Sequence, residues 1–171
     1  AADMDGDGKV DLVFQHTDGT LAVWYLDGID RKSTALLRPD NPGDANWRAV
    51  SAGDVDLDGK PDLVFQHRDG TLAVWHLDGI NLRSAALFNP PTPGGENWRL
   101  AGTGDFNSDG KLDLLFNHSD GTLAVWFLDG IRLTEAALLD PSNPGDRRWR
   151  VVAVARMSAP IASMPDPAAP R

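Results

Sequence analysis

The apolar and polar residues of this chain follow a pattern that predicts short paired β-strands. The run DLVFQH at 62–67 is rich in β-branched and aromatic residues, and it is followed by a polar turn and by LAVWHL at 72–77. Leu72 and Trp75 point to opposite faces of the second run, so both of its faces are largely apolar. Asp-Gly between two apolar runs is a strong hairpin signal. We therefore expect two antiparallel strands that are covered on both sides.

Two further strands complete one copy of the pattern. A weaker apolar run at 82–88 follows a second Asp-Gly turn. A loop rich in Pro, Gly and Asn, 89–97, then leads to WRLAGTG at 98–104. No segment keeps a long 3.6-residue period, so helices are not expected. Each copy thus predicts four short strands with a turn signal after each.

The copies are 51 residues apart without insertions. Trp24, Trp75 and Trp126 occupy equivalent positions, as do the blocks DGTLAVWxLDGI at 18–29, 69–80 and 120–131. Repeats of this size with four strands are typical of propeller blades. We predict an all-β fold, a β-propeller of four-stranded antiparallel blades with three 51-residue repeats. A sandwich would not repeat at a fixed spacing, and the coil of a β-solenoid would be shorter.

The repeats divide the chain into blades at about 3–53, 54–104 and 105–154, followed by a Pro- and Ala-rich tail at 155–171. The last Trp-Arg strand, 149–154, has no acidic loop after it, so we expect it to close a ring. Three blades are fewer than the usual four to eight. Either two chains form a six-bladed ring as a homodimer, each donating its last strand, or the chain is a fragment of a longer propeller. Its start within a strand favours the fragment.

Three acidic loops, DMDGDGKVD, DVDLDGKPD and DFNSDGKLD, precede the first strand of the copies. Oxygen ligands at alternate loop positions can converge on one hard cation, and Ca²⁺ takes six to eight of them. Glycine at position 6 permits the sharp turn, and position 7 supplies its backbone carbonyl. The candidate ligands for three Ca²⁺ ions are Asp3, Asp5, Asp7, Lys9 and Asp11, then Asp54, Asp56, Asp58, Lys60 and Asp62, then Asp105, Asn107, Asp109, Lys111 and Asp113.

The loops match only the first nine positions of an EF-hand loop. Position 12, where an EF-hand has a bidentate Glu, is Phe14, Phe65 or Phe116, and the flanking segments are predicted strands. A helix-opening mechanism is therefore excluded. Asn107 keeps an oxygen but removes a charge, so we expect the third site to bind more weakly than the second. The alternatives are purely structural polar turns, or Mg²⁺, which prefers more rigid octahedral sites.

Composition narrows the function further. The chain has no cysteine, which excludes disulfides, thiolate metal sites and cysteine nucleophiles. Eleven of the 25 acidic residues lie in the three loops, and three divalent cations would cancel six of the nine net negative charges. No basic stripe points to a nucleic-acid partner. No apolar run is long enough for membrane insertion.

Tandem copies with D-x-D-x-D-G-x-x-D ahead of a strand resemble FG-GAP/VCBS repeats, and DFNSDGKLDLLF, DGTLAVW and WRLAGTGD resemble bacterial VCBS copies. The resemblance covers residues 1 to about 154, although the Phe-Gly and Gly-Ala-Pro signatures are absent. It implies a calcium-stabilised propeller of a secreted or cell-surface protein. Members act in adhesion, as lectins, or as modules of polysaccharide-degrading enzymes.

Two sets of repeated side chains are candidates for chemistry. His16, His67 and His118 precede the hairpin turn, and we interpret them as turn-stabilising groups rather than bases. The unrepeated His76 is interpreted as a half-buried filler. We expect Trp24, Trp75 and Trp126 to pack between blades; Trp47, Trp98 and Trp149 either do the same or stack on sugars.

These observations predict no catalytic residue and no enzyme activity. We expect a calcium-binding, non-catalytic module that recognises a carbohydrate or a protein ligand, in adhesion or as a lectin. The variable loops at 38–46, 89–97 and 140–148 would carry the ligand surface. The alternative is the propeller portion of a polysaccharide-active enzyme, such as a lyase, with its active site outside this chain.

Overall fold

The computed structural model describes residues 2–154, and it shows eleven strands and no helix in that range. The strands are β1 (Leu12–Gln15), β2 (Leu21–Asp27), β3 (Asp30–Leu36), β4 (Trp47–Gly53), β5 (Asp62–His67), β6 (Leu72–Asp78), β7 (Asn81–Leu87), β8 (Trp98–Gly104), β9 (Asp113–His118), β10 (Leu123–Asp129) and β11 (Arg132–Leu138). The all-β prediction is confirmed. Since this range has no helix, none of its segments is a helix that could cross a membrane.

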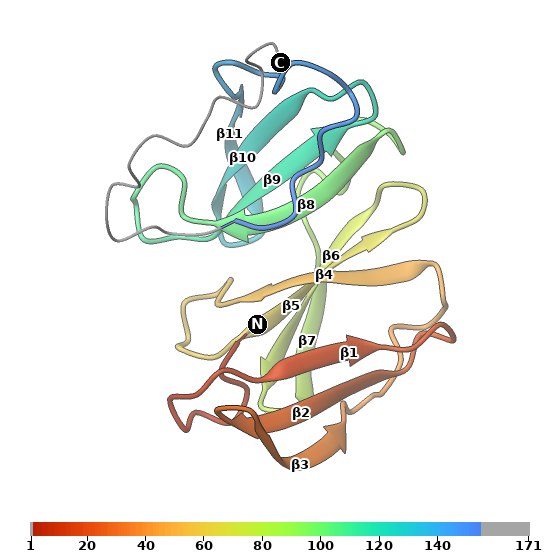
Figure 1. Cartoon of the computed structure of the whole chain (residues 1–171), viewed down its shortest axis with the longest axis vertical. Coiled ribbons are helices and arrows are strands. Elements are labelled where there is room, and N and C mark those ends of the chain that lie inside the picture. Colours follow the sequence, from red (N-terminus) through yellow and green to blue (C-terminus); the bar gives the residue numbers. More distant parts are fainter. Residues whose placement is uncertain (1, 155–171) are drawn as a thin grey trace.

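The strands form three antiparallel sheets that follow one another along the long axis of the molecule (Figure 1). The sheets are β1-β2-β3, β4-β5-β6-β7 and β8-β9-β10-β11. The predicted hairpin of 62–67 with 72–77 is present, with Leu63 opposite Trp75 and Gln66 opposite Leu72. The three sheets do not close into a ring within the described residues.

Each four-stranded sheet takes its first strand from the end of the preceding 51-residue copy. β4 pairs with β5, and Gly53 lies opposite Asp62 across the acidic loop. The boundaries that the sequence placed at 54 and 105 therefore cut through the sheets, which run from 47 to 87 and from 98 to 138. The reason is connection length, because the short acidic loop returns the chain antiparallel beside itself, whereas the loop at 89–97 carries it to the next sheet.

The first sheet has only the end of a fourth strand. Ala2 bridges Asp11, and this is the position at which Gly53 bridges Asp62. At the other end of the chain, the predicted strand at 149–154 is not a strand, although it runs beside β8, where Val154 lies against Gly102 and Gly104. Its sequence equivalents pair with the strand after the next acidic loop, and no such loop follows residue 154. The predicted tail at 155–171 lies outside the described residues.

Two apolar clusters hold the three sheets together. Between the first two sheets, Val23 packs with Phe65 and Trp75, and the equivalent cluster between the second and third sheets includes Phe116 and Trp126. The predicted packing between sheets is thus confirmed for Trp75 and Trp126, each 7% exposed. Across the second junction, the hydroxyls of Ser51 in β4 and Thr103 in β8 lie 2.7 Å apart. The first strands of neighbouring sheets are therefore adjacent.

The other four tryptophans differ in how far they are buried. Trp47 and Trp98 pack against the two clusters, which supports the packing interpretation for both. Trp24 is 37% exposed, so the prediction that it packs between sheets is wrong for the first copy. The physical reason is that no sheet precedes the first one in the described chain. Trp149 is also exposed, at 46%.

Candidate metal centres

The first carboxylate of each acidic loop organises the turn. Asp54 accepts hydrogen bonds from the backbone N–H groups of Asp58 at 3.0 Å and Gly59 at 2.9 Å. Asp3 accepts equivalent bonds at 3.1 and 2.8 Å, and Asp105 at 3.1 Å each. The three loops thus have the same local fold. The glycine at position 6 has φ of 84°, 85° and 83° in the three copies, which confirms the predicted sharp turn.

The predicted carboxylates converge in the first two loops. One ligand oxygen from each of Asp54, Asp56 and Asp58 lies within 4.8 Å of the other two, and the same holds for Asp3, Asp5 and Asp11. Adjacent carboxylate oxygens repel one another unless a cation neutralises them. These two donor sets consist only of carboxylate oxygens, which fits the preference of Ca²⁺.

The third loop differs at its third position. The side-chain amide of Asn107 donates to Asp109 Oδ2 at 3.2 Å, and its Oδ1 accepts from the backbone N–H of Asp109 at 3.1 Å. An uncharged amide therefore occupies the place of a second carboxylate. This arrangement agrees in direction with the predicted lower affinity of the third site, which stays a prediction.

The last aspartate of each loop is buried, a role that its place in the acidic motif does not predict. Asp62 is 1% exposed and accepts hydrogen bonds from the N–H groups of Val55 and Leu77, both at 3.0 Å. Asp11 and Asp113 make the equivalent pairs of bonds. Each carboxylate thus joins the acidic loop to the second strand of the hairpin. Its remaining lone pairs leave capacity for a cation.

The lysine at position 7 extends away from the loop. Lys60 Nζ lies 2.7 Å from Asp78, and Lys111 Nζ lies 2.7 Å from Asp129, at the end of the second strand. Hydrogen bonding lowers the pKa of the Asp129 carboxyl and raises that of Lys111. The prediction that this side chain points outward is confirmed for both lysines. Lys9 bridges Asp27 at 3.0 Å and Asp7 at 3.6 Å.

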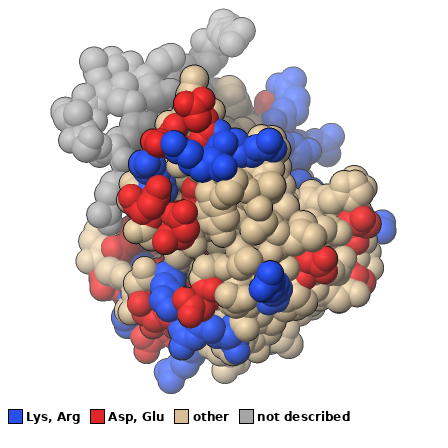
Figure 2. Space-filling model, turned by 90° about the horizontal axis from the view of Figure 1, so that it is seen from below, with Lys and Arg blue, Asp and Glu red and all other residues tan. Residues whose placement is uncertain are grey.

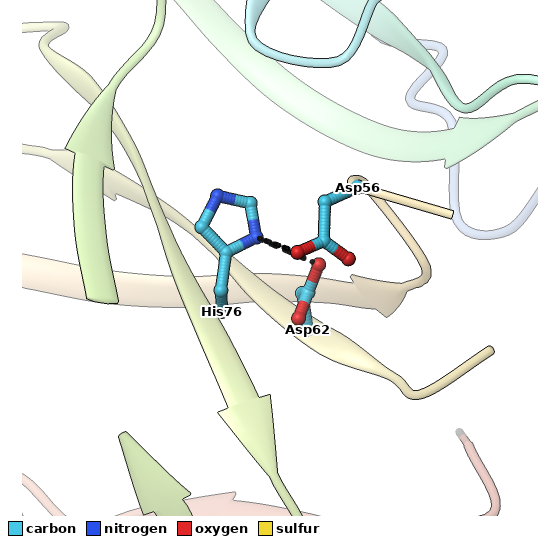
Figure 3. A group of neighbouring side chains, drawn as sticks. All are labelled: Asp56, Asp62 and His76. Carbon is cyan, nitrogen blue, oxygen red and sulfur yellow. Dashed lines mark hydrogen bonds and ion pairs between the residues drawn. The ribbon is translucent and has the colours of Figure 1, made fainter. Parts of the chain in front are cut away.

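The second loop has contacts with two side chains that have no counterparts at the other loops, His76 (Figure 3) and Arg83. His76 Nδ1 lies 3.1 Å from Asp62 Oδ2 and 3.6 Å from Asp56 Oδ2. The residue is half-buried as expected, but the filler interpretation is wrong, because its ring contacts two candidate ligands. The guanidinium of Arg83 contacts Asp58. A cation at this loop must compete with Arg83 for that carboxylate.

The repeated histidines stabilise the hairpin turns. His67 Nδ1 lies 2.9 Å from Asp69 Oδ1, which also accepts the backbone N–H of Thr71 at 2.8 Å. The bond from Thr71, aided by His67, lowers the pKa of Asp69 to about 2. The Trp47 ring packs against His67 at a tilt of 54°, with ring centroids 5.0 Å apart. The turn-stabilising interpretation is confirmed, with the aspartate side chain as an additional partner that was not expected.

A pocket of about 210 Å³ opens beside the variable loop at 89–97. It is lined by Pro93, Trp98, Phe116, Ala124, Trp126, Ala136, Ala137 and Leu138. Aromatic rings and small apolar side chains make up this lining. The pocket therefore suits an apolar or aromatic group, or the C–H face of a ring.

Comparison with known proteins agrees with the repeat. A family model described as FG-GAP-like repeat matches residues 3–65 and 58–116. These ranges contain the first two acidic loops with their hairpins, and the second extends through the third loop into β9. No match was found among curated proteins or among solved structures.

Proposed function

The chain belongs to the FG-GAP-like repeat family, and on that basis we propose that it is a calcium-binding, non-catalytic β-propeller module of a secreted or cell-surface protein. Its role is recognition of a carbohydrate or a protein ligand in adhesion. Family membership supports the adhesion class, and the three consecutive antiparallel sheets are the shape that propeller blades require.

The convergence of carboxylates in the acidic loops is the observation that carries the proposal. The oxygens of Asp54, Asp56 and Asp58 gather at the start of β5, ahead of a strand that is buried along most of its length. Three loops with one design would hold one ion each. Millimolar extracellular calcium would keep such loops loaded even at the moderate affinity of extracellular modules.

Calcium acts here as a structural cross-link. The bound ion supplies positive charge that offsets repulsion among the carboxylates. Asp62 accepts hydrogen bonds from Val55 in the loop and from Leu77 in β6. Ordering the loop therefore also orders the strand pair behind it. The ion thereby stabilises each sheet at the edge where its first two strands meet.

The recognition role is supported by the position of an apolar pocket beside a loop that varies between copies. The histidines that could act as bases are engaged in turns with aspartates, as His67 is with Asp69. The pocket beside Trp98 and Pro93 adjoins a loop that differs between copies. A ligand surface on such loops leaves the sheets unchanged.

Calorimetry and a glycan array test the proposal together. Calcium should bind with three equivalents, and D54N/D56N should remove one of them. Binding of a defined sugar or surface protein by the calcium-loaded chain supports the recognition role. Turnover of a polysaccharide by the chain alone would replace this proposal with the enzyme alternative, and absence of calcium binding would refute the metal assignment.

A further inference from the structure

We propose that a second copy of this chain completes the first sheet. Residues 149–154 of the second copy add as a fourth strand to the free edge of β1, and its β8–β11 sheet packs on the outward face of β1–β3. This inference does not rest on calcium binding. It rests on apolar side chains in the first and third copies that are exposed, whereas their equivalents in the other copies are buried.

The outward face of the first sheet exposes apolar side chains where a terminal sheet should be polar, although the Arg31 guanidinium lies 4.8 Å from the centre of the Trp24 ring. Leu12, Phe14 and Trp24 are 38%, 41% and 37% exposed, whereas their equivalents Leu63, Phe65 and Trp75 are 2%, 1% and 7% exposed. Viewed from the β1–β3 end, the surface shows a broad area without charged side chains (Figure 2). Repeat proteins end in units with a polar outer face when nothing covers them. This face is therefore an unfinished junction rather than a cap.

The chain itself shows what covers such a face. Leu63 and Phe65 of the second sheet pack against the first sheet in a cluster that includes Met4. In the same way, Phe116 of the third sheet packs against the second sheet in a cluster that includes Val55. Met4 and Val55 are 2% and 3% exposed, but their third-copy equivalent, Phe106, is 38% exposed. Phe14 and Phe106 thus correspond to the two sides of one contact between neighbouring sheets. A second copy of the chain would supply the missing side to each of them.

The edge of β1 is also incomplete. A cavity of about 160 Å³ lies between β1 and β4, lined by residues 12–15, 49–52 and Leu63. This is the place of a missing strand, because β4 lies beside β8 in the same way at the next junction. Ala2 already occupies the last register position, opposite Asp11. The space that remains is opposite residues 12–16, and it fits 149–154.

The register of β8 with β9 in the third sheet specifies the expected pairs. The segment 149–154 takes the place of β8, one repeat later in sequence, and β1 takes the place of β9, two repeats earlier. Trp98 lies opposite His118 and Gly102 opposite Leu115, so Trp149 would lie opposite His16 and Ala153 opposite Val13. The Trp98 ring packs against His118. The corresponding pair is unmatched in the single chain, since the side chain of His16 is 68% exposed and Trp149 is 46% exposed.

The last Trp-Arg segment is also less firmly held than its two equivalents. Gln66 clamps β8 by donating to the carbonyl of Trp98 at 3.0 Å and accepting the N–H of Leu100 at 2.9 Å. Gln15 clamps β4 in the same way. The third copy has the shorter Asn117, whose amide contacts the carbonyl of Thr122 at 3.5 Å instead. The segment at 149–154 is therefore available to a partner.

A second copy fits better than closure within one chain. Val154 lies against Gly104 of β8, and the whole β4–β7 sheet separates this segment from β1. Two chains joined head to tail would bring together six four-stranded sheets, a number within the range that closes without excessive wedge angle. One contact is unfavourable. By analogy with the parallel bridge of Asn89 to Arg132, the new junction sets Asp140 beside Asp30.

Cysteine cross-linking tests this arrangement, because the chain has no cysteine of its own. V13C/A153C should give a disulfide-linked dimer on mild oxidation. I29C/A153C is the matched control and should remain unlinked, since Ile29 is 99% exposed in the β2–β3 turn. A cross-linked monomer would show that the segment closes its own chain, and absence of any cross-link would exclude the proposed register. Either result overturns the proposal.

Light scattering on unsubstituted protein gives an independent readout that no substitution can disturb. A mass of twice 18.5 kDa is expected, and a stable monomer overturns the proposal. W149A should weaken the dimer at least about tenfold, as truncation of a buried interface tryptophan does, whereas I29A should not. D140N should strengthen it by relieving the contact with Asp30. Unchanged dissociation in W149A would contradict the contact of Trp149 with His16.

Discussion

Trp98 packs against His118 with their rings tilted by 50° and ring centroids 4.7 Å apart, and the two residues lie directly opposite each other in the β8–β9 register. The contact joins the first residue of a sheet's first strand to the turn of the next hairpin. Trp47 and His67 repeat it one sheet earlier. The repeated tryptophan and the repeated turn histidine, which are two separate features in the sequence, therefore form one interaction in the fold.

Removal of calcium should destabilise the protein strongly. Saturating an ion site at a hundred times its dissociation constant contributes about 2.7 kcal/mol to the free energy of unfolding. We expect EDTA to lower the melting temperature and added Ca²⁺ to restore it, as measured by calorimetry. Mg²⁺ at the same concentration is the control. A melting temperature that does not respond to EDTA would contradict the metal assignment.

The calcium affinity of the second and third loops should change when the residue that distinguishes each loop from the others is replaced. N107D restores a carboxylate to the third loop, and R83T replaces the guanidinium that contacts Asp58 with the residue found at the equivalent position, Thr134. Both substitutions should increase calcium affinity at their own loop, by about tenfold for one added charge interaction of roughly 1.4 kcal/mol. Titration calorimetry measures this, and T134R should lower the affinity of the third loop.

Two aspartates of one loop should separate structural from metal-binding roles. D62N leaves one buried N–H group, of Val55 or Leu77, without a carboxylate acceptor. We expect a loss of about 1–3 kcal/mol in unfolding free energy even in EDTA. D56N, in the same loop but exposed, should destabilise the protein only when calcium is present, because in EDTA it relieves repulsion among the loop carboxylates. Equal effects of the two substitutions in EDTA would argue against the buried role of Asp62.

The turn aspartates should contribute to acid stability. Backbone hydrogen bonds lower the pKa of Asp18, Asp69 and Asp120 from 3.8 to about 2. A carboxyl whose pKa is lower in the folded state adds stability above its unfolded pKa and loses it as the pH falls through the folded value. In calcium-free buffer, the unfolding free energy should decline between about pH 4 and pH 2. The triple variant with asparagine at these positions should show a shallower decline in urea titrations.

The backbone of the second loop offers a conformational test. Leu57 has φ of 61°, in the left-handed region, and the equivalent residue of the first loop is Gly6, with φ of 79°. L57G should stabilise the protein by up to about 1 kcal/mol, because a left-handed leucine costs more than the added freedom of glycine in the unfolded chain. G59A, at φ of 85°, should destabilise it. Urea unfolding of both variants measures the difference.

The sequence by itself determined the strands, the hairpin turns and the three acidic loops, because each is written in neighbouring residues. Alternation of apolar residues, Asp-Gly pairs and aspartates at every second position act over a few residues, and their recurrence at 51 residues removed the ambiguity of any one copy. The glycine at position 6 and the outward lysines follow from this local pattern.

Tertiary structure alone decided which strands share a sheet and which copies are equivalent in their surroundings. Leu12 and Leu63 have the same local sequence, yet one is 38% and the other 2% exposed, because only the second has a sheet packed in front of it. The burial of Asp62 and the contact of His76 with it likewise join positions 14 residues apart on different strands. Such features depend on what lies across the fold, and identical repeats acquire different environments only once they are stacked.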